Sequence, residues 1–220
     1  MAQDGKIWPR DPASLWPSLR FFVTASLIVS LIAVLWQGYE LVVGEISIDD
    51  ESLPTLIWML GGVAILVSGL VVTFFCIILT CRLTYRMMKN LHVLEAPVEL
   101  MAPAWAVGWY FVPLANLIMP KRAVDRIWKG TYALSSEPEP NSEVIGLWWW
   151  MWIASNILGQ VSFRMAGGMG EPATGQPYVA SLYLGVGSSL ISAASCWFML
   201  KTFGTLVRAQ SAIIRTRAFD

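Results

Sequence analysis

The 220 residues are 56% hydrophobic and 12% aromatic but only 14% charged, against about 25% charged in ordinary soluble domains. The shortage of charge excludes an ordinary soluble domain, the aromatic content excludes a disordered chain, and three cysteines are too few for a disulfide-rich module. The 15 basic and 15 acidic residues balance, so net charge gives no reason to expect a nucleic-acid partner.

Four stretches of the chain are long and apolar enough to cross a bilayer, which takes about 20 residues for a hydrocarbon core of about 30 Å. None of them carries a charged side chain at its centre, and none alternates as a membrane-crossing strand would. The sequence therefore predicts an all-α polytopic integral membrane protein with four transmembrane helices. We expect them at about 21–43, 56–81, 144–163 and 178–200.

The basic residues predict the orientation of these helices. All of them except Arg164 lie before the first stretch, between the second and third, or after the fourth. The positive-inside rule makes those segments cytoplasmic, with both termini inside. We expect a cytoplasmic segment at 1–20, one membrane domain at 21–210 and a cytoplasmic tail at 211–220. The outward loops then hold an acidic cluster, Glu45, Asp49, Asp50 and Glu51.

The connection between the second and third stretches begins as a continuation of the second helix. Arg82, Arg86 and Lys89 recur at helical spacing and share one face. Such a basic stripe suits a lipid head group or a partner protein, and a simple solvated helix end is the equally open alternative.

The next part, residues 103–120, is uncharged but too short to cross a bilayer. Pro103, Pro113 and Pro120 break any single helix, while Trp105 and Trp109 favour the head-group level. We expect a broken interfacial or re-entrant element that other helices cover, because an irregular backbone exposed to lipid would leave polar groups unsatisfied.

An amphipathic helix follows at about 121–134. Val124, Ile127 and Trp128 recur at helical spacing, opposite Arg122 and Arg126. This basic face suits an anionic membrane surface, so the segment 103–134 as a whole is predicted to be interfacial.

The same segment resembles the signature of the bacterial membrane family known as domain of unknown function 4328. The resemblance covers about residues 55–210 and implies a bacterial membrane protein, but it implies no chemistry. The matching motif positions are Pro103, Trp105, Ala106, Gly108, Trp109, Phe111, Pro113, Asn116, Pro120, Ala123 and Trp128, with support from Arg86, Asn90, Trp148, Trp149, Arg208 and Gln210.

The sequence offers little catalytic or metal-binding chemistry. His92 is the only histidine and is expected at a surface helix end, although an acid–base pair with Glu95 or Glu99 is an alternative. We expect packing roles for the three cysteines, Cys76, Cys81 and Cys196, and we predict no catalytic residue, no metal site and no enzyme activity.

Few polar groups fall within the predicted membrane helices. Glu40 is expected near the outer end of the first helix, close to water. Asn156 and Gln160, one turn apart on the third helix, are expected to form hydrogen bonds across helices, with a polar site as the alternative. This pattern argues against an ion pump, which needs ionisable groups in the membrane.

The fourth helix carries a stripe of small residues, which permits close helix packing. Whether this stripe meets helices of the same bundle or a partner protein stays open, with the bundle as the default. The stripe consists of Ser181, Gly185, Ser188, Ser192 and Ser195.

Twelve tryptophans are unusual for a chain of this length. We interpret many of them as an aromatic belt at the cytoplasmic leaflet, with a flat wall for a pigment, quinone or partner helix as the alternative. The proposed belt comprises Trp105, Trp109, Trp128, Trp148, Trp149, Trp150 and Trp152.

Together these patterns favour a non-enzymatic accessory or scaffolding subunit of a larger membrane assembly. The alternatives are a small transporter or lipid-handling protein that uses Pro103–Pro120, and a sensor of lipid charge. No cofactor is predicted. We expect bound lipid, and as partners other membrane-protein subunits or a second copy of the chain, with no nucleic acid.

Overall fold

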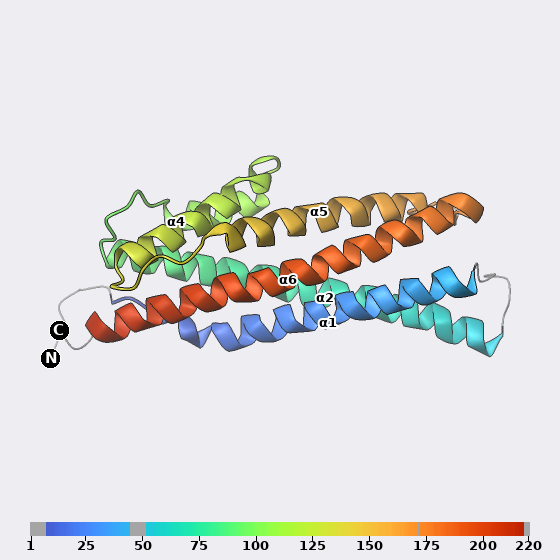
Figure 1. Ribbon diagram of the computed structural model, residues 1–220, viewed down its shortest axis with the longest axis horizontal. Helices are drawn as coiled ribbons and strands as arrows, with labels where there is room; N and C mark the ends of the chain where they lie inside the picture. The colour runs from blue at the N-terminus through green and yellow to red at the C-terminus, as the bar shows by residue number, and fades with distance from the viewer. Residues whose placement is uncertain (1–7, 45–51, 171, 218–220) are drawn as a thin grey trace. The chain divides into compact units, whose positions relative to one another are not determined.

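The computed structural model describes residues 8–44, 52–170 and 172–217, and over these residues the chain is helical without a strand (Figure 1). This confirms the all-α prediction. The predicted acidic cluster Glu45, Asp49, Asp50 and Glu51 lies outside the described residues. Four long helices dominate: α1 (Trp16–Val43), α2 (Leu53–Val93), α5 (Glu143–Met165) and α6 (Gly175–Arg217).

Three of the long helices, α1, α2 and α6, are apolar and long enough to cross a membrane. They match the first, second and fourth predicted spans. The fourth long helix, α5, has sufficient length at 23 residues, but it is not among the three candidates in the described part of the chain. Its tryptophans, together with Asn156 and Gln160, make it less apolar than the others.

Short helices connect α2 to α5, and they break where the prolines predict. Helix α3 (Pro103–Gly108) leads into two 3₁₀ turns, η2 (Trp109–Phe111) and η3 (Ala115–Leu117), with Pro113 between them. Helix α4 (Met119–Ala133) then begins with Pro120 in its first turn, where a missing N–H costs nothing. A further 3₁₀ turn, η1 (Pro12–Ser14), precedes α1.

The chain divides into two compact units, which we describe separately. The core unit holds the described residues up to Phe21, Cys76–Leu147 and those from Phe198 onward. The bundle unit holds Phe22–Phe75 and Trp148–Trp197. Helices α1, α2, α5 and α6 each contribute to both units.

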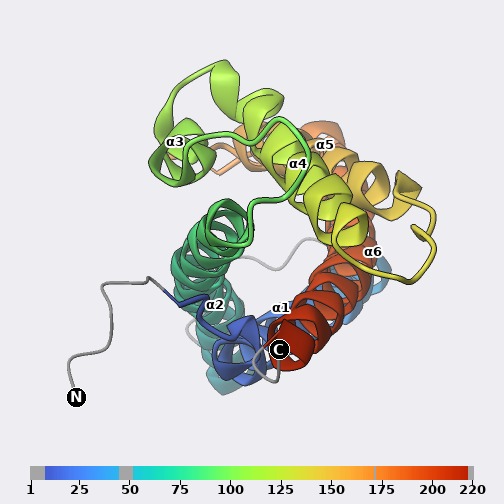
Figure 2. The ribbon, with the colours of Figure 1, turned by 90° about the vertical axis from the view of Figure 1, so that its left-hand side faces the viewer.

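The core unit contains nearly all of the largest fully buried side chains, among them Met87, Ile127 and Phe203. Figure 2 views the ribbon from the end where the C-terminal parts of α2 and α6 and helix α4 of this unit lie. Helices α2 and α4 approach closely at Gly130. A Cβ atom there would lie 2.8 Å from Leu91 Cδ1 and 3.2 Å from Val98 Cγ2. Glycine at this position therefore allows the two helices to pack together.

The bundle unit has a different character, because its apolar side chains point outward. Only 6% of the most apolar window of α2 is buried, as expected when lipid is the solvent. Helices α1 and α2 pack through aromatic rings: Phe22 stacks on Phe75 with centroids 4.7 Å apart, and Trp36 stacks on Trp58 at 6.3 Å. These pairs hold the hairpin together at both ends.

Candidate functional site

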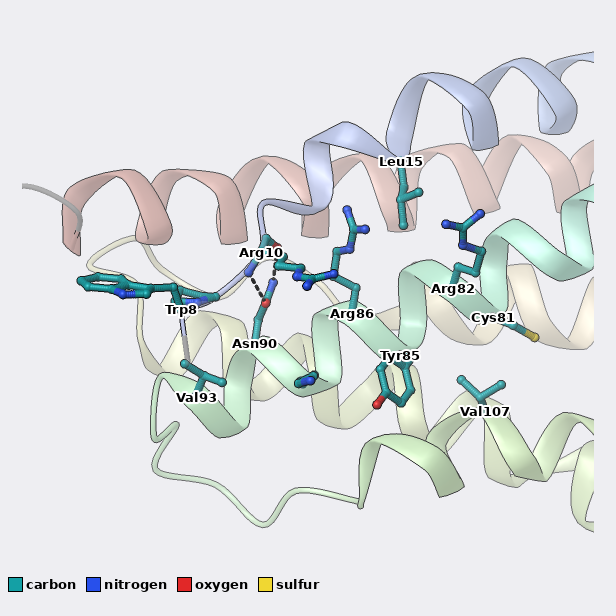
Figure 3. Close-up of a pocket in the computed structure, with 12 residues that line it drawn as sticks. Trp8, Arg10, Leu15, Cys81, Arg82, Tyr85, Arg86, Asn90, Val93 and Val107 are labelled. Carbon is teal, nitrogen blue, oxygen red and sulfur yellow. Dashed lines mark hydrogen bonds between the residues drawn. The ribbon is translucent and has the colours of Figure 1, made fainter. Parts of the chain in front are cut away.

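The clearest candidate site is a pocket of about 720 Å³ in the core unit, beside the end of α2 (Figure 3). The predicted stripe residues Arg82, Arg86 and Lys89 line this pocket, and Arg10 from the N-terminal segment joins them. The remaining lining residues are apolar, aromatic or uncharged polar: Trp8, Pro9, Leu15, Cys81, Tyr85, Asn90, Val93 and Val107.

The other two predicted contact residues lie elsewhere. Arg122 and Arg126 are on α4 and do not line the pocket. Arg126 pairs with Glu99 at 3.6 Å, whereas the Arg122 side chain is exposed. The structure thus gathers three of the five predicted basic residues in one pocket and separates the other two from them.

Asn90 and Arg86 hold the N-terminal segment against α2. The Asn90 carboxamide accepts a hydrogen bond from Arg10 N at 2.9 Å and donates one to Arg10 O at 2.8 Å. Arg86 Nη1 donates to Asp11 O at 3.2 Å and to Ser14 Oγ at 2.5 Å. Both side chains belong to the family-like positions, and here they build one wall of the pocket.

A buried polar network continues from Asn90 into the core. Asn90 Nδ2 donates to Gln210 Oε1 at 3.3 Å, and Gln210 Nε2 donates to Thr131 Oγ1 at 3.1 Å and to Met87 O at 3.3 Å. Gln210 is completely buried. This network links α2, α4 and α6. The resemblance of Asn90 and Gln210 to positions of the family signature was the only sequence signal that pointed to it.

The motif segment has both exposed and buried faces. Trp105 and Phe111 are exposed, whereas the indole N–H of Trp109 and Oδ1 of Asn116 are buried and have no hydrogen-bond partner among the described residues. Gly108 lets the Trp105 ring approach, since a Cβ there would lie 3.4 Å from that ring. Of the three motif prolines, Pro113 is exposed, Pro103 is half-buried and Pro120 is buried.

Tyr110 packs inward within this segment. Burial raises the pKa of the Tyr110 hydroxyl above its ordinary value, and Cys81 on α2 raises it further. A hydrogen bond with Thr84 of α2 opposes this rise in the pKa.

The tryptophan belt predicted from the sequence is only partly available to lipid. Trp105 and Trp150 are more than half exposed, but Trp128, Trp148 and Trp149 are at most 4% exposed. The expectation that Trp128 lies on a membrane-facing surface is therefore wrong. The apolar face of α4 packs into the core unit instead, and the Trp128 ring lies tilted beside Tyr132, with ring centroids 5.2 Å apart.

The small-residue stripe of α6 packs inside the bundle unit, against two different helices. On α5, Ser162 Oγ donates to Ser181 O, Ser188 Oγ donates to Ser155 O, and Ser195 Oγ donates to Trp148 O, at 2.8 to 3.0 Å. On α1, Ser30 Oγ donates to Ser192 Oγ at 3.2 Å, and the Gln37 side chain lies against Gly185. The stripe is thus a contact face between helices of the same chain.

Glu40 lies within the bundle, contrary to our expectation that it is close to water. It is 8% exposed, and both Trp36 and Tyr178 form hydrogen bonds with its side chain. Its carboxyl group is therefore held by α1 and α6.

Asn156 and Gln160 are both exposed on α5. The Asn156 carboxamide donates to Trp152 O of its own helix at 2.7 Å, so the expected bond across helices is not formed by this donor.

The other reactive side chains considered in the sequence are His92 and the three cysteines. His92 is exposed, and its Nε2 lies 3.0 Å from Met101 O. Cys76, Cys81 and Cys196 form no disulfide bond. Within residues 8–44, 52–170 and 172–217, no three His, Cys, Asp or Glu side chains gather as a metal site.

Comparison with known proteins places the chain in one family. No curated protein and no solved structure gives a significant match to it. A family model described as "Domain of unknown function (DUF4328)" matches residues 50–208, which include the proline- and tryptophan-rich motif, all of α2 and the buried Asn90. The chain therefore belongs to the DUF4328 family.

Proposed function

We propose that this protein is a non-enzymatic, four-span protein of the bacterial inner membrane that acts by contact, as an accessory or scaffolding subunit. The observation that carries this proposal is the exposure of Asn156 and Gln160 near the middle of α5. Asn156 donates one hydrogen bond to Trp152 O of its own helix. Facing hydrocarbon, any further donors and acceptors of the two carboxamides would find no partner, which is unfavourable. A transmembrane helix of another subunit, with a polar side chain of its own, would supply those partners.

The proposal needs α5 to cross the membrane, and its packing supports this. With 23 residues, α5 is about 34 Å long, enough for a hydrocarbon core of about 30 Å. Its three serine-mediated contacts with α6 recur every seven residues, from Trp148–Ser195 through Ser155–Ser188 to Ser162–Ser181. Because α6 is itself a candidate span, the antiparallel α5 beside it would lie at the same depth in the membrane.

The orientation follows from helix length and charge. Helices α2 and α6 have 41 and 43 residues, about 62 and 65 Å, which is twice the thickness of the hydrocarbon core. Their C-terminal parts carry the basic residues, which favours the cytoplasmic side for both. Arg122 and Lys129 of α4, both exposed, would face the same anionic surface.

A labelling experiment tests the fourth span. In a variant with the three native cysteines replaced by alanine, single cysteines are introduced at Ser135, before α5, and at Gly170, after it. We expect a membrane-impermeant thiol reagent added to intact spheroplasts to label position 170 and to leave position 135 unlabelled until the membrane is opened. Labelling of both positions from the outside, or of neither, would overturn the crossing of α5.

A second experiment tests the contact role. We expect gentle detergent extraction and native mass measurement to find the chain bound to a different membrane protein. The double variant Asn156→Leu, Gln160→Leu should lose this partner, because leucine offers no hydrogen bond. Leu35→Ala on the exposed face of α1 serves as the control and should retain it. A wild-type chain that runs alone or only as a homo-oligomer would exclude an accessory subunit.

The alternative function is a small transporter or lipid-handling protein that uses Pro103–Pro120. The unpartnered polar atoms of Trp109 and Asn116 support it, since a ligand could satisfy them. We favour the contact role because Val107 is the one residue of that segment among those that line the described pocket.

A further inference from the structure

The pocket beside α2 carries positive charge without nearby ion pairs. Elsewhere in the described residues, Lys121 pairs with Asp125 and Arg126 pairs with Glu99. None of the four pocket cations forms a salt bridge with a described residue, and no acidic residue lines the pocket. The carboxylate of Asp11 attracts the Arg86 guanidinium electrostatically. The same carboxylate accepts a hydrogen bond from Ser211 Oγ at 2.5 Å. The four cations are Arg10, Arg82, Arg86 and Lys89.

The positive side of the pocket is held in place before any ligand arrives. Figure 3 shows Arg82 and Arg86 projecting from one face of α2 toward the N-terminal segment, with Arg10 beside Arg86. The two Asn90 bonds to the Arg10 backbone fix that segment, and the contacts of Arg86 with Asp11 O and Ser14 Oγ orient its guanidinium. A preorganised cationic surface loses little entropy when it binds an anion.

The other side of the pocket is apolar and continues toward the predicted membrane. Cys81 and Val107 lie on this side, and Tyr85 projects toward α3 (Figure 3). One turn earlier on α2, Ile77 and Ile78 are 42% and 38% exposed. Arg82 is the first charged residue after the uncharged run 56–81. The pocket thus lies where the apolar part of α2 ends and its charged part begins.

We infer that this pocket binds the phosphate head group of an anionic phospholipid, with the acyl chains along the exposed apolar face of α2. A phosphate accepts hydrogen bonds from guanidinium groups and compensates their charge. The volume of about 720 Å³ lies within the usual range for small-molecule sites. A free phosphate compound would present the same anionic group to the arginines. It has no acyl chains, however, so the apolar side of the pocket would have nothing to contact. This inference goes beyond the contact role, which depends on α5.

Lipid titration of the full chain in detergent, followed by native mass spectrometry, tests the inference. We expect phosphatidylglycerol to bind more tightly than phosphatidylcholine. The double variant Arg82→Gln, Lys89→Gln should weaken phosphatidylglycerol binding roughly thirtyfold, since each basic residue near a lipid surface contributes on the order of 1 kcal/mol. Both side chains are exposed, so the fold should be retained. An unchanged thermal transition of the variant verifies this.

The matched control removes the same charge elsewhere. Arg20→Gln, Arg208→Gln replaces two exposed basic residues outside the pocket and should leave binding within about twofold of the wild type. Equal losses in both double variants, or equal affinity for the two lipids, would overturn the site. Competition by millimolar glycerol 3-phosphate would also overturn it as a lipid site and would assign the pocket to a free phosphate compound.

Discussion

Replacement of Gln210 by leucine should lower the free energy of unfolding by about 3 kcal/mol. Leucine has a similar volume but removes the hydrogen bonds that Gln210 makes with Asn90, Thr131 and Met87 O. Each buried polar group left without a partner costs about 1–3 kcal/mol. Because the site is completely buried, water cannot replace the lost bonds.

Thermal unfolding in detergent, followed by tryptophan fluorescence, measures this loss. A decrease of 3 kcal/mol corresponds to a shift of roughly 6–12 °C for a chain of this size. Arg208→Gln, an exposed change on the same helix, is the control and should shift the transition by less than about 2 °C. If the two variants behave alike, the polar network does not stabilise the core unit.

Two neighbouring glycines of α2 should respond in opposite ways to alanine. A Cβ at Gly61 would overlap the six-membered ring of Trp36, with Cζ3 only 2.8 Å away. The indole would have to move, although it stacks on Trp58 and binds Glu40. We expect Gly61→Ala to destabilise the protein by about 2 kcal/mol, as is typical of overpacking.

At Gly62 the nearest atom to a new Cβ would be Trp36 Nε1 at 3.8 Å, an ordinary contact. Gly62→Ala should therefore be neutral or stabilising by up to about 1 kcal/mol, the helix-propensity gain of alanine over glycine. The pair is measured by the same thermal assay. Equal transition temperatures for the two variants would mean that Trp36 does not pack against Gly61 as described.

The helical architecture was largely predictable from the sequence because its causes are local. Long uncharged runs identify α1, α2 and α6, and the prolines at 103, 113 and 120 mark the breaks between α2 and α4. The spacing of Arg82, Arg86 and Lys89 placed them on one helix face. Each of these inferences depends on residues that are close along the chain. Over such short separations, helical geometry fixes the direction in which each side chain points.

The candidate site was only half predictable. Three of its cations come from one helix face, but Arg10 comes from 80 residues before Asn90, which binds its backbone. Charge pattern alone also could not separate Arg122 and Arg126, on α4, from the pocket residues. Which basic residues share a pocket depends on how distant segments pack, and no spacing along the chain encodes that.

The sequence by itself determined that this is a helical chain with apolar spans, a broken proline-rich segment and basic residues collected in a few segments. The tertiary structure decided that Trp128 is core rather than surface, because α4 turns its apolar face toward the buried core. It also divided the α6 stripe, giving Ser181, Ser188 and Ser195 to α5 and Gly185 and Ser192 to α1. Amphipathicity shows that a face will be covered, but only the packing of the neighbouring helices determines what covers it.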